Sequence, residues 1–442
     1  MPDRCRLVAL AGLLAACGAA QAQSLTTLYD AAHGYDAAYL SARALYDSTP
    51  YRVEQTEALL RPTAAAAASA GRTQVNAGYL PNSSYGNWTS AASVNGRQPL
   101  FNPGNAATVK QAERSLDSAA ADLDTAEQDL ILRLSQAYFD VLGAEDTLRT
   151  TRANKTAIAE QLASAKRNFE VGTATITDTR EAQARYDLAT AQEIAAENDL
   201  HTKRIALDQL VGRQNVQPFG LVAPVALPAI EPANADDWVR LAETQHPAIR
   251  RAAVALDVAR LEIEKARAAR YPTVDAVGSV ATSRGPLGGL TGSALGTTSS
   301  ASVGVQLNMT LYSGGAITNR IHETEVLAQR AQDDLDNARR TVTQATRQAF
   351  YTLASGSAQV KALEAAEASS QLALEATQLG YRVGVRVNID VLNAQTQLYQ
   401  TQRDLARARY DVLLGQLRLR QAAGRVTAQD VASIDRLLQQ QR

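Results

Sequence analysis

Two long proline-free stretches constrain the fold of this chain more than any other feature of its sequence. None of the 13 prolines lies between Pro103 and Pro218, and none follows Pro286. Proline inside a helix costs about 3 kcal/mol, so long uninterrupted helices are possible mainly in these two stretches. We predict one long helix over residues 106–168 and another over 316–379. Roughly 60 residues at about 1.5 Å per residue give rods on the order of 90 Å.

The composition fits helices that pack closely side by side. The chain is rich in Ala but has only five Phe and two Trp, and Ala is a strong helix former that buries little area. After each long helix we predict a Gly-containing turn and a returning helix, over 178–210 and 390–422, so that each half forms an antiparallel coiled-coil hairpin. In the first long helix, apolar and Ala positions recur at helical spacing: Leu116, Ala119, Leu123, Leu130, Leu134, Ala137, Val141 and Leu148.

The two halves of the chain are an internal repeat with an offset of about 212 residues. The same order of elements is therefore predicted twice, as expected of a duplication. The matching segments are Gln136–Phe139 with Gln348–Tyr351, Phe169–Gly172 with Tyr381–Gly384, Asp178 with Asp390, Val211–Arg213 with Ala423–Arg425, and Leu100–Phe101 with Leu311–Tyr312.

Each half is also predicted to carry a β-hairpin. From Val303 to Leu311, apolar residues alternate with polar ones, which is typical of a strand with one face of each kind. Residues 286–301 are rich in Gly, Ser and Thr and read as a loop, with a weaker partner strand around 274–280 before it. The first half has a fainter pair, roughly 63–79 and 87–101, around the turn Pro81-Asn82-Ser83.

These four strands suggest an outer-membrane barrel shared between chains. Strands of about ten alternating residues suit such a barrel, whose smallest members have about eight strands. Four strands cannot close, and open sheet edges are not tolerated in lipid. We therefore expect several chains to contribute to one barrel.

The sequence is predicted to consist of an N-terminal targeting segment followed by two repeats with a linker between them. Residues 1–22 read as a signal peptide, with a basic start, an apolar stretch and the cleavage site Ala20-Gln21-Ala22. Leu14-Ala15-Ala16-Cys17 also matches a lipoprotein site, so lipidation at Cys17 stays open. We expect a first repeat over 23–217, a Pro-rich linker over 218–235 and a second repeat over 236–442.

Charge and motif content argue against nucleic-acid binding and against catalysis. The formal net charge is −1, so there is no basic field to attract nucleic acid. His322-Glu323 begins like a zinc-protease helix, but Val326 stands where the second His is required. The sequence has neither a phosphate-binding loop nor a G-x-S-x-G motif. We expect no enzymatic activity, no metal site and no cofactor.

Several segments resemble the TolC family of outer-membrane efflux proteins, in the expected order and over nearly the whole mature chain. The long helix and the strand-to-helix junction are similar, and the two hairpin tips look like the family's periplasmic tips. The segments are Ala137–Leu142, Phe169–Asp178 with Tyr186-Asp187, Leu311–Gly315 and Gly380–Ala394.

The resemblance implies a mainly α-helical fold with a small membrane β-barrel portion. Three chains would form a homotrimer, with a twelve-strand barrel in outer-membrane lipid and an α-barrel tunnel of helical hairpins in the periplasm. Such a channel-tunnel is an exit duct that works with a periplasmic adaptor (membrane fusion protein) and an inner-membrane ABC or proton-driven transporter. The cargo would be an exported protein or a small molecule, and the tip motifs favour type I protein secretion.

Two other functions fit part of the sequence. A periplasmic coiled-coil adaptor would explain the hairpins, but neither the alternating strand nor the duplicated plan. A structural cell-surface coiled coil would lack the two turn motifs.

The resemblance also implies a pore aperture made by aspartates at the tunnel end. Asp390 matches one ring, whereas Asn393 occupies the position of the second, so this chain departs from the family pattern. Three carboxylates around a narrow pore favour cations, and a neutral amide weakens that field. The alternative is that Asp390 is only the N-cap of a helix.

By the same resemblance, Tyr381 and Arg386 match gating positions, with Thr177 and Asp178 as partners on the first hairpin. Hydrogen bonds between these residues would latch the hairpins shut. The segment Asp178-Thr-Arg-Glu181 also has the spacing of a capping box, with Asp in place of Ser or Thr, so a capping role for Asp178 is open.

Gly172 and Gly384 are predicted turn glycines with positive φ. The resemblance places these turns at the tip that faces the adaptor, so that substitution would impair assembly. If the glycines merely end helices, a folded trimer with normal export is expected instead.

Overall fold

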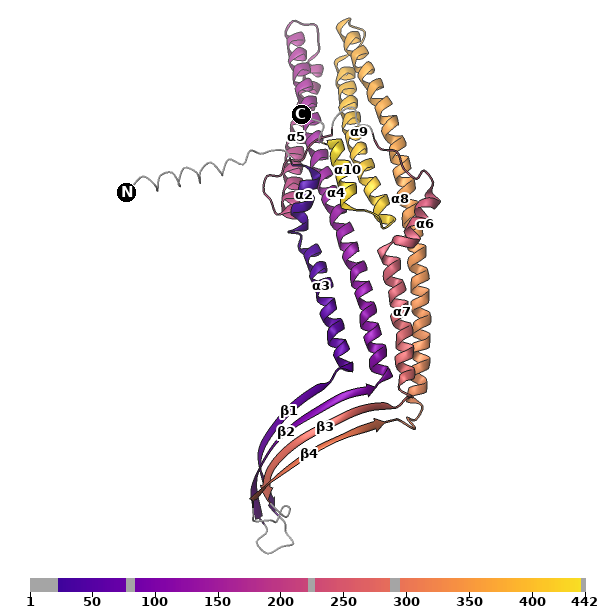
Figure 1. The fold of residues 1–442 in the computed structure, drawn as a ribbon. Coiled ribbons are helices and arrows are strands. Elements are labelled where there is room, and N and C mark those ends of the chain that lie inside the picture. The colour runs from indigo at the N-terminus through magenta and orange to yellow at the C-terminus, as the bar shows by residue number, and fades with distance from the viewer. Residues whose placement is uncertain (1–22, 77–83, 222–226, 287–294, 439–442) are drawn as a thin grey trace, which may run out of the picture. The chain divides into compact units, whose positions relative to one another are not determined.

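The computed structural model describes residues 23–76, 84–221, 227–286 and 295–438. The signal peptide, Cys17 and the turn Pro81-Asn82-Ser83 lie outside the described residues. Helices and strands follow the duplicated order that the sequence predicts (Figure 1). In the first half these are α2 (Leu25–His33), α3 (Ala37–Glu57), the 3₁₀ turn η1 (Ala58–Leu60), β1 (Thr63–Asn76), β2 (Ser84–Phe101), α4 (Pro103–Glu170) and α5 (Ile176–Val211). The second half has α6 (Ala235–Gln245), α7 (Pro247–Ala268), β3 (Thr273–Pro286), β4 (Leu295–Asn308), α8 (Ala316–Arg382), α9 (Asn388–Ala422) and α10 (Ala428–Leu438).

The two predicted long helices are confirmed as α4 and α8, with 68 and 67 residues. α4 begins at Pro103 itself, because the first helical position needs no N–H donor and suits the fixed φ of proline. The Asn102 side-chain oxygen accepts the Asn105 N–H at 3.0 Å and caps this end. The returning helices α5 and α9 have 36 and 35 residues. Among the described helices, none has an apolar stretch long enough to span a bilayer.

One shorter helix, α3, continues through a proline. Pro50 lies inside it, where the ring fits a helical φ but removes one backbone hydrogen bond. The neighbouring Thr49 is 3% exposed, and its hydroxyl donates to the Leu45 carbonyl at 2.9 Å. A helix of 21 residues can therefore contain one proline, whereas α4 and α8 contain none after their first residue.

The chain divides into two compact units that both draw on both halves of the sequence. The helical unit takes Met1–Arg43, Asp122–Ile249 and Ala338–Arg442, and the strand unit takes Ala44–Ala121 and Arg250–Asn337. Because α4 and α8 are so long, each contributes to both units. The spatial units are thus different from the sequence repeats.

The core of the helical unit is formed by α2, α4, α5, α9 and α10. Tyr138 is fully buried there, and its hydroxyl donates to the Phe219 carbonyl at 3.0 Å. Burial raises the pKa of Tyr138. The rings of Tyr138 and Phe139 meet edge to face, as do those of Phe350 and Tyr351 at the equivalent positions of the second half. The duplication therefore extends to side-chain packing.

The four strands form one antiparallel sheet in the order β1-β2-β3-β4. β2 and β3 come from different halves and pair with each other, so the sheet joins the two repeats. Among the described residues, β1 and β4 are edge strands, each with one partner.

The predicted limits of the last strand are wrong at both ends. The segment predicted as a loop supplies the start of β4, because Leu295 to Ser300 pair with Ala281 to Pro286 across the hairpin. Thr and Ser can satisfy such a ladder, and Thr favours strands. At the other end β4 stops at Asn308, which is paired with Thr273. The preceding Pro272 has no N–H to extend the pairing to Leu311.

The sheet has one apolar and one polar face. Directly paired residues of antiparallel strands share a face, and residues two apart along a strand do also. The apolar face carries Val94, Val280, Val303, Val305 and Leu307, all more than half exposed. The polar face carries small or hydrogen-bonding residues: Ser69, Ser93, Asn95, Ser279, Ser283, Ser300, Ser302 and Gln306.

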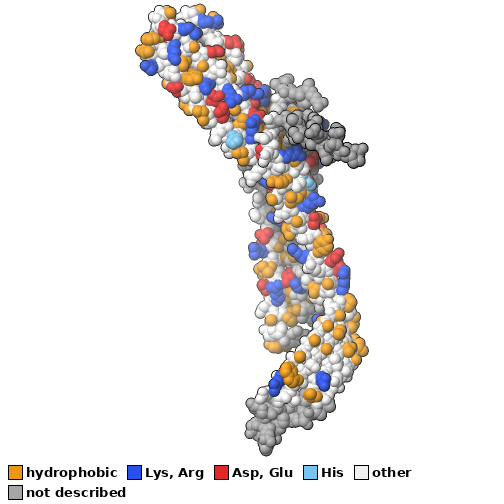
Figure 2. Space-filling model, turned by 90° about the vertical axis from the view of Figure 1, so that its left-hand side faces the viewer, with side chains coloured by type: hydrophobic (Ala, Val, Ile, Leu, Met, Phe, Trp, Pro, Cys, Tyr) orange, Lys and Arg blue, Asp and Glu red, His pale blue; other side chains and the backbone are white. Residues whose placement is uncertain are grey.

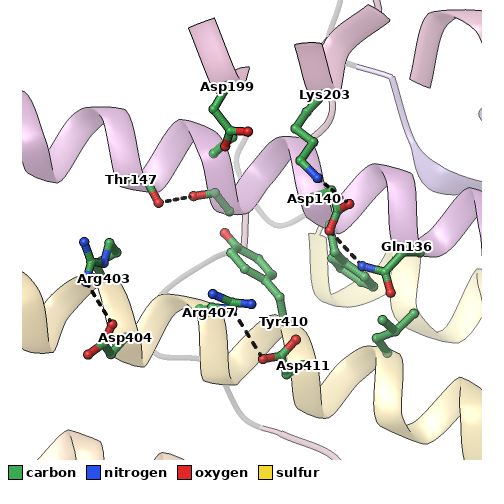
Figure 3. A pocket seen from close by; sticks show the side chains of 14 residues that line it. Gln136, Asp140, Thr147, Asp199, Lys203, Arg403, Asp404, Arg407, Tyr410 and Asp411 are labelled. Carbon is green, nitrogen blue, oxygen red and sulfur yellow. Dashed lines mark hydrogen bonds and ion pairs between the residues drawn. The ribbon is translucent and has the colours of Figure 1, made fainter. Parts of the chain in front are cut away.

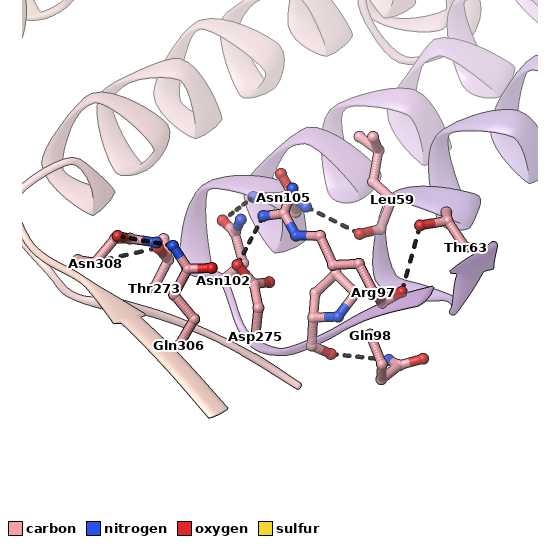
Figure 4. Close-up of polar contacts among 11 residues, drawn as sticks. Leu59, Thr63, Arg97, Gln98, Asn102, Asn105, Thr273, Asp275, Gln306 and Asn308 are labelled. Atoms are coloured by element: carbon pink, nitrogen blue, oxygen red, sulfur yellow. Dashed lines mark hydrogen bonds and ion pairs between the residues drawn. The ribbon is translucent and has the colours of Figure 1, made fainter. Parts of the chain in front are cut away.

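A charged pair on the polar face joins the two halves (Figure 4). The Arg97 guanidinium on β2 donates to the Asp275 carboxylate on β3 at 2.8 Å. The Asp275 side chain is 3% exposed, whereas that of Arg97 is 57% exposed. Nearby, the Gln98 side-chain amide donates to the Leu60 carbonyl at 2.9 Å and so holds η1 to β2.

Candidate functional site

The tips of the two helical hairpins share one turn geometry. Gly172 and Gly384 have φ of 78° and 80°, as predicted for turn glycines. In the first tip, the Asn168 carbonyl accepts the N–H groups of Thr173 and Ala174 at 2.8 and 3.2 Å. In the second, the Gly380 carbonyl accepts those of Val385 and Arg386 at 2.9 and 3.2 Å. A Cβ atom at either turn glycine would meet no atom within 4 Å, so only the backbone conformation requires glycine there.

The returning helices begin differently. α5 has a capping box in which the Asp178 N–H donates to the Thr175 hydroxyl at 3.2 Å and the Thr175 N–H donates to the Asp178 carboxylate at 3.0 Å. The predicted capping box from Asp178 to Glu181 is wrong, because Thr175 is the N-cap and Asp178 is its N3 partner. The Thr175 hydroxyl thus gives a partner to a backbone N–H in the first turn of α5, which has none within the helix.

In the second tip, the alternative role of Asp390 as an N-cap is wrong. The N-cap of α9 is Val387, which has no side-chain cap, and Asp390 lies three residues later. Its carboxylate forms an ion pair with the Arg386 guanidinium at 3.6 Å. A carboxylate in the first turn also interacts favourably with the helix dipole.

Three side-chain hydrogen bonds connect the two hairpins near their tips. The Asn168 amide donates to the Tyr381 hydroxyl at 3.2 Å. Arg185 on α5 donates to the Asn393 side-chain oxygen at 3.2 Å. The third bond joins Gln161 on α4 to the buried Asn388 on α9.

Apolar packing accompanies these bonds. Leu392 of α9 is 1% exposed and lies in a cluster otherwise made by the first hairpin. The other members of that cluster are Ile158, Leu162, Ala165, Ala182 and Ala189, with Tyr186 and Ile389 at its edge. Leu392 is next to Asn393, so this packing holds the start of α9 against the first hairpin.

The predicted latch residues are therefore only partly brought together. Tyr381 reaches the first hairpin, but through Asn168, which the sequence analysis did not single out. Arg386 pairs within its own hairpin, and Asp178 within the α5 cap. Thr177 is exposed, and no described contact joins it to Tyr381 or Arg386. Asn168, Arg185 and Gln161 carry no signal in a single sequence, because Asn, Arg and Gln are ordinary residues of exposed helix surfaces.

Ion pairs also hold the first hairpin together along its length. The carboxylate of Glu193 on α5 accepts hydrogen bonds from Lys155 at 2.7 Å and from Arg152 at 3.1 Å. The hydrogen bond from Lys155, followed by that from Arg152, lowers the pKa of Glu193.

Away from the tips, α4, α5 and α9 line a groove of about 500 Å³ (Figure 3). Six of its seven charged side chains form ion pairs: Lys203 with Asp140 at 3.1 Å, Arg403 with Asp404 at 3.5 Å and Arg407 with Asp411 at 3.9 Å. The Tyr410 hydroxyl, which lies on α9, donates to Asp146 of α4 at 2.6 Å. Burial, with the nearby Asp146 charge, raises the pKa of Tyr410. In this groove the Tyr410–Asp146 hydrogen bond joins the two hairpins, because each of the three ion pairs lies within a single hairpin.

No metal centre is found in the part of the chain that the structure describes, where no group of three His, Cys, Asp or Glu side chains is suitably arranged. No histidine is among the residues that line the groove.

Comparison with known proteins connects this architecture to a family. The family model described as outer membrane efflux protein matches residues 28–213 and again 238–425. The chain is 30% identical to the outer membrane protein TolC of Vibrio cholerae over 418 residues, which covers 94% of this chain and 93% of that protein. It is 33% identical to the alkaline protease secretion protein AprF of Pseudomonas aeruginosa over 301 residues, or 67% and 62% of the two chains.

A solved structure has the same fold. The outer membrane protein VceC of Vibrio cholerae superimposes with a TM-score of 0.77 at 19% identity, over 90% of this chain and 96% of that chain. The duplicated family match and the long TolC relative agree with this fold. They do not support the alternatives of a periplasmic adaptor or a structural coiled coil. The chain belongs to the TolC family of outer membrane efflux proteins and is an outer-membrane exit duct, extending into the periplasm, of efflux and secretion systems.

Proposed function

We propose that three copies of this chain form one duct for type I protein secretion. Their twelve strands would close a single barrel in the outer membrane, and their hairpins would form a tunnel in the periplasm. The duct would receive its cargo from an inner-membrane ABC transporter through a periplasmic adaptor. The similarity to AprF, which is named for alkaline protease secretion, supports a protein cargo over a small molecule.

The observation that carries the proposal is the four-stranded sheet with two faces and two edges. β1 and β4 each leave a row of backbone donors and acceptors without a partner among the described residues. Such edges are not stable in lipid, and joining β4 of one copy to β1 of the next satisfies them. The apolar face would then meet lipid and the polar face would line the lumen, as in other outer-membrane barrels.

The division into repeats over 23–217 and 236–442, with a linker over 218–235, belongs to the same proposal. The family model matches twice, over 28–213 and 238–425, which supports these limits. Residues 1–22 would direct the chain across the inner membrane and would then be removed from the mature protein.

At the periplasmic end, Asp390 would supply a ring of three carboxylates and Asn393 a neutral ring. The ion pair of Asp390 with Arg386 reduces the negative potential of that ring, and Arg185 holds Asn393. We therefore propose a cation preference weaker than two acidic rings would give.

The hairpin tips would contact the adaptor. Around Gly172 the exposed apolar residues are Phe169, Val171 and Ile176, and around Gly384 they are Val383, Val385 and Val387. The two turns have the same backbone hydrogen bonds and so the same shape. An adaptor with an apolar surface could therefore cover the exposed apolar residues of both turns in the same way.

The test is the state of the purified mature chain in detergent and in planar bilayers. We expect a trimer by light scattering that migrates differently in gels before and after heating, and discrete channel conductance. Asp390→Asn should lower the cation-to-anion permeability ratio while leaving the trimer intact. A water-soluble monomer without conductance would rule out the shared barrel.

Cargo is tested separately, by deletion of the gene. Loss of a secreted protein with unchanged drug susceptibility is expected for type I secretion. Increased drug susceptibility with an unchanged set of secreted proteins would instead assign the duct to efflux.

A further inference from the structure

We propose that the end of the apolar face remote from α4 and α7 binds phosphate groups of lipid headgroups in the outer leaflet of the outer membrane. The site is made by Arg72 on β1 and Arg284 on β3, with Trp88 on β2 between them. This inference rests on the proposed barrel, in which the apolar face meets lipid. It adds a specific lipid chemistry that a shared barrel does not itself require.

Strand register places the three residues together on one face. Arg72 is directly paired with Trp88, so their side chains share a face. Ser90, two residues after Trp88, is directly paired with Arg284. Neighbouring strands lie about 4.8 Å apart, and the two arginines are offset by two residues, about 7 Å, along the strands. Their Cα atoms are therefore about 12 Å apart, and two long arginine side chains can reach one headgroup from that spacing.

The same register shows that this is the apolar face. Val94 lies six residues after Trp88 and is paired with Val280, four residues before Arg284. Along β2 and β3 the face therefore changes from apolar residues near the helices to Arg and Trp at the other end. In Figure 2, hydrophobic side chains are spread over the strands of the sheet, and Lys or Arg side chains lie toward the end remote from the helices.

The charges of the strands leave these two arginines without a counter-ion. The four strands together contain three Arg and one Asp: Arg72, Arg97, Arg284 and Asp275. Asp275 lies on the polar face, where it pairs with Arg97. The sequence has no Asp or Glu between Glu57 and Glu113, nor between Asp275 and Glu323. Neither hairpin can therefore supply an acid to Arg72 or Arg284.

Both arginines are exposed, and so is Trp88, at 65%. The Arg72 guanidinium lies beside Gly86, where a Cβ atom would be 3.5 Å from its nitrogen. The guanidinium therefore lies over the neighbouring strand β2.

The chemistry of the face identifies the occupant. An unpaired guanidinium facing hydrocarbon is unfavourable, whereas at the membrane surface it binds phosphate with two parallel hydrogen bonds. Trp is enriched at this same level, because its ring is apolar and its N–H needs a polar partner. On a surface continuous with the lipid-facing band, the available anion is the headgroup phosphate. Because α4 and α7 lie at the periplasmic end, that headgroup belongs to the outer leaflet.

The experiment measures binding of lipid A by the purified, delipidated full-length trimer, with native mass spectrometry as the readout. Lipid A carrying both phosphates is compared with chemically dephosphorylated lipid A and with inorganic phosphate alone. We expect the phosphorylated lipid to bind about 30-fold more weakly to the variant Arg72→Gln/Arg284→Gln than to the wild type. Dephosphorylated lipid A should bind both proteins equally, and free phosphate should bind neither measurably.

Three further variants test the assignment. Arg72→Lys/Arg284→Lys keeps the charge and should retain most of the preference for phosphate. Arg330→Gln removes an exposed arginine from α8 and should have no effect. Trp88→Leu should weaken both lipids alike.

Equal binding of phosphorylated lipid A by the wild type and the double Gln variant would overturn the site. If the double Gln variant does not form a trimer, equal binding of the two lipids by the wild type would overturn it instead. Failure of the barrel is recognised separately, because then the wild type itself would show neither trimer nor conductance.

Discussion

The hydrogen bond from Asn168 to Tyr381 is the contact by which a proposed gating residue reaches the other hairpin. A single partly buried bond of this kind contributes about 1 kcal/mol. We predict that Tyr381→Phe and Asn168→Ala each raise single-channel conductance in planar bilayers, because the tips separate more readily. The double variant should conduct no more than either single variant, since both remove the same bond.

Additive effects in the double variant would show that the two residues act through other partners. Arg386→Ser is an informative comparison, because Arg386 pairs with Asp390 in its own hairpin. It was expected from the resemblance to open the latch as Tyr381→Phe does. The ion pair instead indicates that its main effect is a stronger cation preference, since it uncovers the Asp390 charge.

At the scale of residues, the sequence predicted which residues lie at the hairpin tips better than it predicted which residues they contact. The turn glycines followed from the repeat and from the need for positive φ. Asp178 was found, but its partner is Thr175, because a cap depends on the residue at which the helix starts. Asn168 and Arg185 were missed, because their roles depend on how two hairpins far apart in sequence lie side by side.

At the scale of elements, a charged contact fixes the start of α3 against α4. Both Asp36 carboxylate oxygens accept from the Arg133 guanidinium, at 2.8 and 3.1 Å, and one also accepts the Tyr39 N–H at 2.9 Å. The hydrogen bond from Arg133 is the main reason that the pKa of Asp36 is lowered, although burial opposes it. Arg133 is 44% exposed, so screening limits the contribution to about 1 kcal/mol.

This contact predicts a loss of stability in acid. Because the pKa of Asp36 is lower in the folded chain than the unfolded value of about 3.9, its contribution is complete above that pH. It is lost as pH falls through the lower folded value. Chemical denaturation at pH 7 and pH 3 should show a smaller difference in unfolding free energy for Asp36→Asn than for the wild type. An identical pH dependence in both proteins would contradict the prediction.

Helices and strands could be predicted where one hydrophobic period extends over a long stretch of the sequence. The helices α4, α5, α8 and α9 were found to within about three residues, because proline-free segments with a helical period have few competing structures. The start of β4 was missed because its Gly, Ser and Thr residues resemble a loop in composition. Only pairing with β3 makes that segment a strand.

At the scale of the whole molecule, the pair Arg97–Asp275 connects the two halves of the duplication within the sheet. We predict that Arg97→Gln lowers the temperature at which the purified protein unfolds, by an amount equivalent to about 2 kcal/mol. The reason is that the Asp275 carboxylate, at 3% side-chain exposure, loses its charged partner.

The matched control is Arg97→Gln/Asp275→Asn, which removes both charges and leaves two neutral amides. It should recover most of the lost stability, as measured by gel migration after stepwise heating. A double variant less stable than Arg97→Gln would mean that the carboxylate has other essential contacts.

The polar face of the sheet has a consequence for how the duct can open and close. Its short hydroxyl and amide side chains, among them Ser279 and Ser302 with hydroxyls 2.8 Å apart, bind water readily. A passage lined in this way stays wet, whereas gating by dewetting needs a narrow ring of apolar side chains. In the proposed barrel the strand-lined part of the passage would therefore stay hydrated, and closure would depend on movement of the helical hairpins.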